Sequence, residues 1–434
     1  MRVVLFNVMR SVGTGRLGER GAALCMVLAG AVGLLASGCR AEFVGPYPCA
    51  DGYASCLQDQ NGCETSIRTD GLNCGACGKA CPLGATCVNA ACGARVPELA
   101  SLMPGSQSAI AVNSTGVFWT EGGNIYSAPL SGGAPTTVAN DAYTCGPSVS
   151  FALDDNALYY WAAGSNCPQP GNCGGLTKLS LLDGTSTVLV ANQPAGNTAS
   201  LNQCGSIAVD AENVYVLTTQ QQGSVSTRAV YKTPLTGGAP MLLATAQGGG
   251  GSQGDALALT PTHLVFEVWM SNGPPSFEVV PLGGAPAFSI ALPPYSNGGG
   301  AFAADADNIY VVGSGCPCGN NSSSGPPGGG VSKIAIGGGG GELLAQFSGQ
   351  AGGIAADATT VYWSTDTTLW KVSKTGGSPI EAAGNLSGGV RGLQCNGCGG
   401  GASASSTPIS IALDATSIYL ADHGTVNAVL KVTK

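Results

Sequence analysis

Large apolar residues, alanines and turn-forming polar residues recur in one fixed order seven times along this 434-residue chain. Each copy has a large apolar residue, an alanine, a second apolar residue, usually an aspartate, three variable residues, an aliphatic residue and usually an aromatic residue. Short apolar runs on either side of a polar turn predict two β-strands joined by a tight connection. The first two positions are Ile110-Ala111, Phe151-Ala152, Ile207-Ala208, Leu257-Ala258, Phe302-Ala303, Ile354-Ala355 and Ile411-Ala412.

The turn position of this repeat sets its period. It is occupied by Asn113, Asp154, Asp210, Thr260, Asp305, Asp357 and Asp414, at intervals of 41 to 57 residues. A period of about 50 residues with several short strands in each copy is typical of a β-propeller, in which each copy forms one blade. We therefore expect an all-β fold with a single propeller over residues 97–434. Seven blades are expected, or six if the first or last copy is not a complete blade.

Each copy supplies four strands, named A to D from the inside outward. For the third copy we expect strand A at Ser206–Val209, strand B at Val214–Thr218, strand C at Val230–Leu235 and strand D at Met241–Ala244. The last copy ends after its strand C, and Glu98-Leu99-Ala100, ahead of the first copy, matches a strand D. We expect this segment to complete the last blade, because closure removes an exposed sheet edge. Lysines recur in strand C and are expected to be solvated near the blade edge: Lys178, Lys232, Lys333, Lys371 and Lys431.

Two copies carry an aromatic signature in strand B. Val117-Phe118-Trp119-Thr120 and Val361-Tyr362-Trp363-Ser364 resemble the YWTD repeat family of β-propellers, and Lys232-Thr-Pro-Leu-Thr-Gly-Gly238 strengthens the likeness. The resemblance covers about 340 residues. It departs in two respects: only some copies keep the tryptophan, and seven copies are present where that family usually has six blades.

The N-terminus has the features of an export signal. Four arginines accompany a largely apolar run, Gly21 to Leu35, which is shorter than the roughly 20 residues of a membrane-spanning helix. Leu35-Ala36-Ser37-Gly38-Cys39 resembles the lipobox of bacterial lipoproteins, in which cleavage precedes an acylated cysteine. We expect a signal peptide over residues 1–38, lipid attachment at Cys39 and a linker over residues 39–48. The protein would then be anchored by lipid in the cell envelope, with the outer membrane favoured by Arg40; an ordinary secretory signal is the alternative.

Cysteines outline a small module ahead of the propeller, over residues 49–92. A short exported segment this rich in cysteine predicts a fold held by disulfides, although spacing alone gives no pairing. Its members are Cys49, Cys56, Cys63, Cys74, Cys77, Cys81, Cys87 and Cys92. The runs that begin at Asn61-Gly62-Cys63-Glu64 and Asn73-Cys74-Gly75 resemble a cysteine-rich module of secreted proteins of myxobacterial type, and that resemblance implies no activity. A zinc site at Cys74, Cys77 and Cys81 is the alternative.

Long connections between the predicted strands all belong to one face of the propeller. Because strand direction alternates, connections from B to C and from D to A lie on the same face, and they hold the remaining cysteines: Cys145, Cys167, Cys173, Cys204, Cys316, Cys318, Cys395 and Cys398. We expect disulfides among them. A four-sulfur zinc site formed by Cys316, Cys318, Cys395 and Cys398 is the alternative.

Candidate catalytic residues are scarce. The two histidines, His263 and His423, have no recognisable catalytic partner in sequence. The repeated aspartates are expected to form turns, with a ring of calcium ligands as the alternative. The glycine runs Gly248–Gly251 and Gly337–Gly341 do not match a phosphate-binding loop and are expected to be flexible turns. We therefore expect no catalytic residue and no cofactor, calcium being the alternative.

The charge balance limits the partners. Without residues 1–38 the chain would have 13 basic and 24 acidic side chains, a net charge of −11, which disfavours nucleic acid. The sequence favours a non-catalytic cell-surface lipoprotein whose propeller binds an extracellular protein or glycan through its cysteine-bearing loops. Gln220, Gln221, Gln222 and Trp269 are candidate contacts. The alternative is a calcium-dependent hydrolase or lactonase-like enzyme with its site at the channel mouth.

Overall fold

The structure is a computed structural model, and all the residues that it describes belong to one unit, Pro48–Lys434. It describes residues 49–56, 65–82, 85, 87–93, 97–103, 108–142, 151–163, 175–191, 205–222, 225–249, 256–268, 275–292, 301–313, 329–347, 351–365, 368–384, 386, 411–422 and 427–434. The predicted signal peptide (1–38), the predicted linker (39–48) and the predicted lipid-attachment site at Cys39 lie outside this set. Every regular element within it is a β-strand, and no helix in it could cross a membrane.

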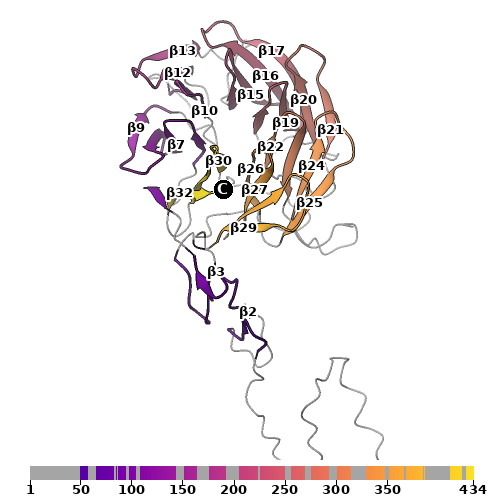
Figure 1. Cartoon of the computed structure of the whole chain (residues 1–434). Coiled ribbons are helices and arrows are strands. Elements are labelled where there is room, and N and C mark those ends of the chain that lie inside the picture. Colours follow the sequence, from indigo (N-terminus) through magenta and orange to yellow (C-terminus); the bar gives the residue numbers. More distant parts are fainter. Residues whose placement is uncertain are drawn as a thin grey trace, which may run out of the picture. The chain divides into compact units, whose positions relative to one another are not determined.

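Seven antiparallel sheets of four strands form the blades of a propeller, which confirms the predicted fold (Figure 1). Blade 1 consists of β6 (Ile110–Val112), β7 (Gly116–Glu121), β8 (Asn124–Pro129) and β9 (Thr136–Ala139); blade 2 of β10 (Phe151–Leu153), β11 (Ala157–Trp161), β12 (Leu176–Ser180) and β13 (Ser186–Val190); and blade 3 of β14 (Ser206–Val209), β15 (Asn213–Gln222), β16 (Val225–Pro234) and β17 (Met241–Gly249).

The remaining blades follow the same strand order along the chain. Blade 4 consists of β18 (Leu257–Leu259), β19 (His263–Val268), β20 (Ser276–Pro281) and β21 (Phe288–Ala291); blade 5 of β22 (Phe302–Ala304), β23 (Asn308–Gly313), β24 (Gly329–Ala335) and β25 (Glu342–Phe347); and blade 6 of β26 (Ala351–Ala356), β27 (Thr360–Thr365), β28 (Leu369–Ser373) and β29 (Ile380–Ala383). Blade 7 has three strands from the end of the chain, β30 (Ile411–Leu413), β31 (Ser417–Asp422) and β32 (Ala428–Thr433).

The fourth strand of blade 7 comes from the other end of the propeller sequence. Strand β5 (Glu98–Ser101) pairs antiparallel with β32, with Ala100 opposite Val429. Leu99 and Ala100 are buried in the cluster that joins blades 7 and 1. The ring is therefore closed by the N-terminal strand that the sequence predicted.

Blades hold together because strand B is buried on both faces. Tyr159 and Trp161 of blade 2 pack against Val214 and Val216 of blade 3, and equivalent clusters join the other neighbours. Full burial of one such side chain contributes about 1.5–3 kcal/mol. Six of the seven repeat alanines lie in these clusters, where the innermost strands leave room for a methyl group: Ala111, Ala152, Ala208, Ala258, Ala303 and Ala412.

Blade 3 corrects the predicted strand limits. Strand A matches the expected residues, but B, C and D continue for about four or five further residues toward the face with the long connections. Gln220, Gln221 and Gln222 consequently lie in β15 instead of in a loop. Gly248 and Gly249, expected in a flexible turn, pair with Ser226 and Val225. The sequence did not predict this extension, because its polar and glycine residues do not alternate with apolar ones.

The strand C lysines were expected to be solvated, but all five are half-buried: Lys178, Lys232, Lys333, Lys371 and Lys431. Two of them link neighbouring blades. The Lys333 ammonium donates a hydrogen bond to the carbonyl of Lys374, and the Lys431 ammonium donates one to the carbonyl of Leu130. A buried ammonium needs such acceptors because desolvation without them is costly. These lysines therefore hold blade 5 to blade 6 and blade 7 to blade 1.

Candidate functional site

The two faces of the propeller are built from different connections. We call the face with the B-to-C and D-to-A connections the loop face, and the face with the A-to-B and C-to-D connections the turn face. In the strand order of every blade, the connections of the turn face are short, whereas long ones such as those after β11, β23 and β29 all reach the loop face. Binding residues concentrate in long connections on a rigid scaffold.

Aspartates on the turn face are held in a repeated hydrogen-bonded arrangement. In blade 3, one oxygen of Asp210 accepts the N–H groups of Glu212 at 2.8 Å and Asn213 at 2.7 Å. Its other oxygen accepts the hydroxyl of Tyr215 at 2.7 Å, five residues further on in strand B. The same pattern occurs in Asp154–Tyr159, Asp305–Tyr310, Asp357–Tyr362 and Asp414–Tyr419. Both oxygens of each carboxylate are thus engaged within the protein.

In the two copies without the turn aspartate, the tyrosine of strand B is replaced as well. Asn113 accepts the turn N–H groups of Thr115 and Gly116 in the same way, and the residue five positions later is Phe118, which has no hydroxyl. In blade 4 the turn is made by Thr260, and Val265 stands at the matching position. Tyrosine therefore occurs only where a carboxylate is present to accept its hydroxyl, a signal that could have been read from the sequence.

Ion pairs strengthen this arrangement between blades 5, 6 and 7. The Lys374 ammonium lies 2.5 Å from the Asp305 carboxylate of the preceding blade, and the Lys434 ammonium lies 2.9 Å from that of Asp357. Burial alone would raise the pKa of Asp305, but Lys374, Tyr310 and two turn N–H groups outweigh it and lower that pKa to about 2. The pKa of Asp357 is lowered to about 2 in the same way, with Lys434 as the largest opposing cause.

The tyrosines titrate in the opposite direction. Burial, followed by the hydrogen bond to the Asp357 carboxylate, raises the pKa of Tyr362 to about 12. The same two causes raise the pKa values of Tyr159, Tyr215, Tyr310 and Tyr419. These hydroxyls stay protonated donors at physiological pH, so the geometry describes a structural turn and not a proton-transfer site.

His263 belongs to this face as well. It begins β19, its N–H donates to the Thr260 hydroxyl at 2.9 Å, and its ring Nδ1 lies 2.8 Å from the hydroxyl of Thr262. These contacts complete the turn of blade 4. His423 lies outside the described residues.

Most of the loop face that the sequence singled out also lies outside the described residues. This applies to Trp269 and to all eight propeller cysteines: Cys145, Cys167, Cys173, Cys204, Cys316, Cys318, Cys395 and Cys398. Their predicted disulfides, and the alternative zinc site, stay predictions. The described parts of this face include the extended end of blade 3, where Gln222 pairs with Val225.

Charged residues near the loop face were missed by sequence reasoning. Glu121, Glu267 and Asp422 lie at or near the loop-face ends of their B strands and are at most 5% exposed, and Arg228 in β16 is 2% exposed. All four take part in polar interactions. One of these is a hydrogen bond that the Met103 N–H donates to the Glu121 carboxylate. Each interrupts an apolar strand pattern, which is the signal that could have identified it. A buried charge is tolerated only when it is paired or hydrogen-bonded.

The cysteine-rich module is held by disulfides between Cys56 and Cys77, Cys74 and Cys87, and Cys81 and Cys92; Cys49 is disulfide-bonded as well, and Cys63 lies outside the described residues. Four short strands accompany them in two hairpins, β1 (Tyr53–Ala54) with β2 (Thr65–Ser66) and β3 (Cys87–Val88) with β4 (Ala91–Cys92).

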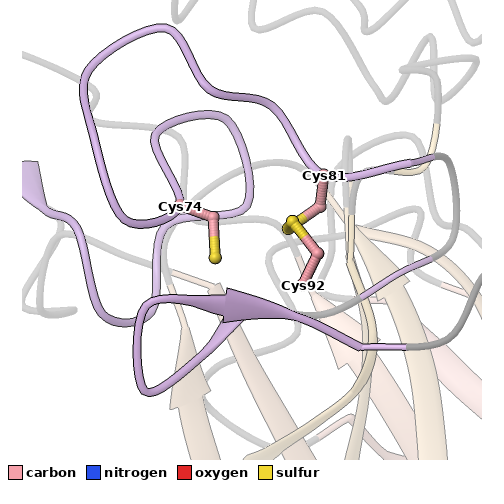
Figure 2. A group of neighbouring side chains, drawn as sticks. All are labelled: Cys74, Cys81 and Cys92. Carbon is pink, nitrogen blue, oxygen red and sulfur yellow. A yellow bond between two sulfur atoms is a disulfide. The ribbon is translucent and has the colours of Figure 1, made fainter.

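Three sulfur atoms of this module lie close enough to suggest a metal site, those of Cys74, Cys81 and Cys92. Figure 2 shows the bond between Cys81 and Cys92, with Cys74 beside it. Zinc binds cysteine as thiolate, and all three sulfurs are already oxidised in disulfides. The zinc alternative for Cys74, Cys77 and Cys81 is therefore wrong in this structure, because each is bonded to a different cysteine.

Comparison with known proteins shows no family for this chain. No protein-family model matches the chain, and no curated protein matches it in sequence. Among solved structures it is similar to the tricorn protease (TM-score 0.46, 11% identity, covering 76% of this chain and 34% of that one). It is also similar to the β-propeller domain of the Trilobed protease from Pyrococcus furiosus (TM-score 0.45, 9% identity, covering 78% of this chain and 96% of that one). A third similar structure is an α-L-arabinanase from Penicillium chrysogenum complexed with arabinobiose (TM-score 0.39, 12% identity, covering 66% of this chain and 92% of that one). At these identities and TM-scores the likenesses carry no conclusion about this chain.

Proposed function

We propose that the chain is a non-catalytic exported lipoprotein whose propeller binds an extracellular protein or glycan through its loop face. The observation that carries the proposal is the contrast between the two faces. The loop-face connections include all the long ones, yet their only charged residues are Asp141, Asp255, Asp366 and Arg391. The short turn-face connections hold Asp154, Asp155, Asp183, Asp210, Glu212, Asp305, Asp307, Asp357, Asp414 and Lys374.

This distribution suits recognition by neutral polar groups. Glycine, serine, asparagine and glutamine dominate the loop-face connections, and such residues offer backbone and side-chain hydrogen bonds without a long-range field. A partner held in this way is recognised by shape and hydrogen bonds, and its affinity depends little on salt. The same lack of charge argues against nucleic acid on this face.

The turn-face geometry counts against the enzymatic alternative. A calcium-dependent hydrolase at the channel mouth needs carboxylate oxygens that are free to bind the ion. The repeated carboxylates instead accept two backbone N–H groups and a tyrosine hydroxyl each. An enzyme would have to draw its ligands from other residues.

Export and anchoring complete the proposal. The disulfide-bonded module is typical of a protein that matures in an oxidising compartment. With lipid on Cys39, residues 39–48 and the cysteine-rich module would separate the propeller from the membrane. Acyl chains contribute about 0.8 kcal/mol per buried CH₂, enough for stable anchoring when more than one chain is present.

Site-specific photo-crosslinking on intact cells tests the proposal. Lysine is absent from the loop-face connections, so a lysine-reactive crosslinker would not report on them. The two ends of β15 offer matched positions: Gln221 near the loop face and Glu212, which precedes the strand on the turn face. A photoreactive residue at position 221 is expected to capture a protein or glycan, and one at position 212 is expected to capture none. Capture from position 212 alone, or from neither position, would refute binding through the loop face.

A further inference from the structure

Blade 3 ends in an edge strand unlike those of the other blades. Strand β17 pairs with β16 along its whole length, from Met241 opposite Lys232 to Gly249 opposite Val225. No strand among the described residues pairs with its outer side (Figure 1). Since successive residues of a strand alternate the direction of their backbone groups, about half of the N–H and C=O groups of β17 face outward.

A β-bulge interrupts the edge strand of most blades, including blade 3. The register between strands C and D shifts once in six of the seven blades. Bulges twist an edge and discourage a further strand from adding to it. Beyond this shift, strand D continues for at most three residues in the other five blades, whereas β17 continues for six, Ala244 to Gly249. Blade 4 has no shift, but its strand D is only four residues long.

The six-residue run Ala244–Gly249 also lacks the residue types that usually prevent a further strand from pairing with an edge. Ala244 and Ala246 pack into the cluster between blades 3 and 4, and Thr245 and Gln247 are exposed on the other side. The run has no charged residue and no proline, the two residue types that usually protect an edge. Strands β5, β25 and β29 each contain a glutamate. Glycine within a strand, as at Gly248, often marks a place where another backbone approaches closely.

We propose that the outer edge of β17 pairs antiparallel with the same edge of a second copy of this chain. A two-fold axis at Ala246 places Thr245 opposite Gln247 of the partner subunit and Ala244 opposite Gly248 of the partner subunit. Each pair occurs twice, and the sheet of blade 3 continues as eight strands across the axis.

The absence of charge favours a second copy over a foreign strand. With the axis at Ala246, residues 245 and 247 of both subunits lie together on one face of the sheet, so charges of one sign at these positions would repel and destabilise strand pairing. In β17 the polar residues are Thr245 and Gln247, which hydrogen-bond to each other across strands without any requirement for opposite charge. The acidic chain as a whole offers no attraction of its own, so the association is weak, with an interface below about 1,200 Å².

Sedimentation velocity of the purified exported chain tests the proposal, at loading concentrations from about 1 to about 300 μM, the range in which weak interfaces associate. We expect a concentration-dependent shift from monomer to dimer. The variant Thr245→Lys/Gln247→Lys places like charges across the axis, and its dissociation constant is expected to rise at least about tenfold. Thr137→Lys in β9, an exposed threonine on a four-residue strand D, is the matched control and is expected to dimerise as the unaltered chain does.

Hydrogen exchange of the unaltered chain gives a second reading that needs no variant. Amides of Ala244–Gly249 that face outward are expected to gain protection as concentration rises, while those of β9 and β13 do not. A chain that is monomeric throughout, or a lysine variant that dimerises like the control, would overturn the proposal. So would a monomeric chain that binds a synthetic peptide of the sequence Met241–Gly249, because the edge would then serve a foreign strand.

Discussion

The carboxylate–tyrosine pairs on the turn face lead to a quantitative prediction for Tyr215→Phe. Tyr215 is 1% exposed, and its hydroxyl donates to Asp210 at 2.7 Å. Phenylalanine keeps the ring packed between blades 3 and 4 but leaves one carboxylate oxygen without its donor. A hydrogen bond to a charged group contributes about 1.5–3 kcal/mol, and the lower end applies here because water reaches the carboxylate from the turn. We expect Tyr215→Phe to lower the free energy of unfolding by about 1.5 kcal/mol.

The natural pair of blade 1 provides the internal comparison. Asp210→Asn/Tyr215→Phe recreates in blade 3 the Asn113 and Phe118 of blade 1, in which the amide oxygen accepts the two turn N–H groups and no hydroxyl is present. We expect the double variant to lose about 1 kcal/mol less than the two single variants together, because the carboxylate charge and its hydroxyl donor are removed at once.

Urea unfolding followed by fluorescence and circular dichroism measures these free energies. Tyr126→Phe is the control, since the Tyr126 hydroxyl accepts only a 3.3 Å hydrogen bond from Asn124 and its removal is expected to cost less than about 0.5 kcal/mol. If Tyr215→Phe is as stable as Tyr126→Phe, or if the double variant equals the sum of the single variants, the carboxylate–tyrosine pairs are not the structural units described above.

Four further outcomes follow from the structure. Acid will destabilise the propeller: the pKa values of Asp305 and Asp357 are about 2 when folded and near 3.8 when unfolded, so their contribution is complete above about pH 4 and is lost as pH falls through about 2. Unfolding measured against pH will show a shallower loss for Lys374→Met. Leu99→Ala will cost about 2–5 kcal/mol by opening a cavity beside the closing strand, whereas the exposed Glu98→Gln will change thermal stability little. Replacing Cys81 and Cys92 by serine will destabilise the cysteine-rich module by about 3 kcal/mol, seen as faster proteolysis of residues 49–92. Dialysis against a calcium chelator will leave the unfolding curve of the propeller unchanged, because its repeated carboxylates are satisfied by protein donors.

Much of the scaffold could be predicted from the sequence because its physical cause repeats. The alanine of strand A and the aromatic of strand B lie between blades in most copies, and the recurrence of the pattern seven times predicted the seven blades that the structure has. The extension of blade 3 could not be predicted in this way. It is formed by Gln220–Gln222 and the glycines of β17, whose pairing depends on neighbouring strands and not on an apolar pattern of their own.

The candidate site, likewise, could be predicted from the sequence only in part. The turn aspartates were correctly expected to form turns, but their second contact was missed, because it becomes visible only when Asp210 is compared with Tyr215 copy by copy. Lys374 and Lys434 reach carboxylates of the preceding blade, a relation between residues 69 and 77 positions apart that no local pattern contains. Pairing of the cysteines in residues 49–92 likewise depends on the fold and not on their spacing.

The most direct test of a loop-face binding protein is equilibrium binding of the crosslinked partner to chains altered on one face at a time. We predict that replacing Gln220, Gln221, Gln222 and Trp269 together by alanine lowers the affinity at least about tenfold, and that Glu212→Ala/Asp307→Ala on the turn face leaves it unchanged. Equal affinities for the two altered chains, or loss confined to the turn-face variant, would contradict the assignment of binding to the loop face.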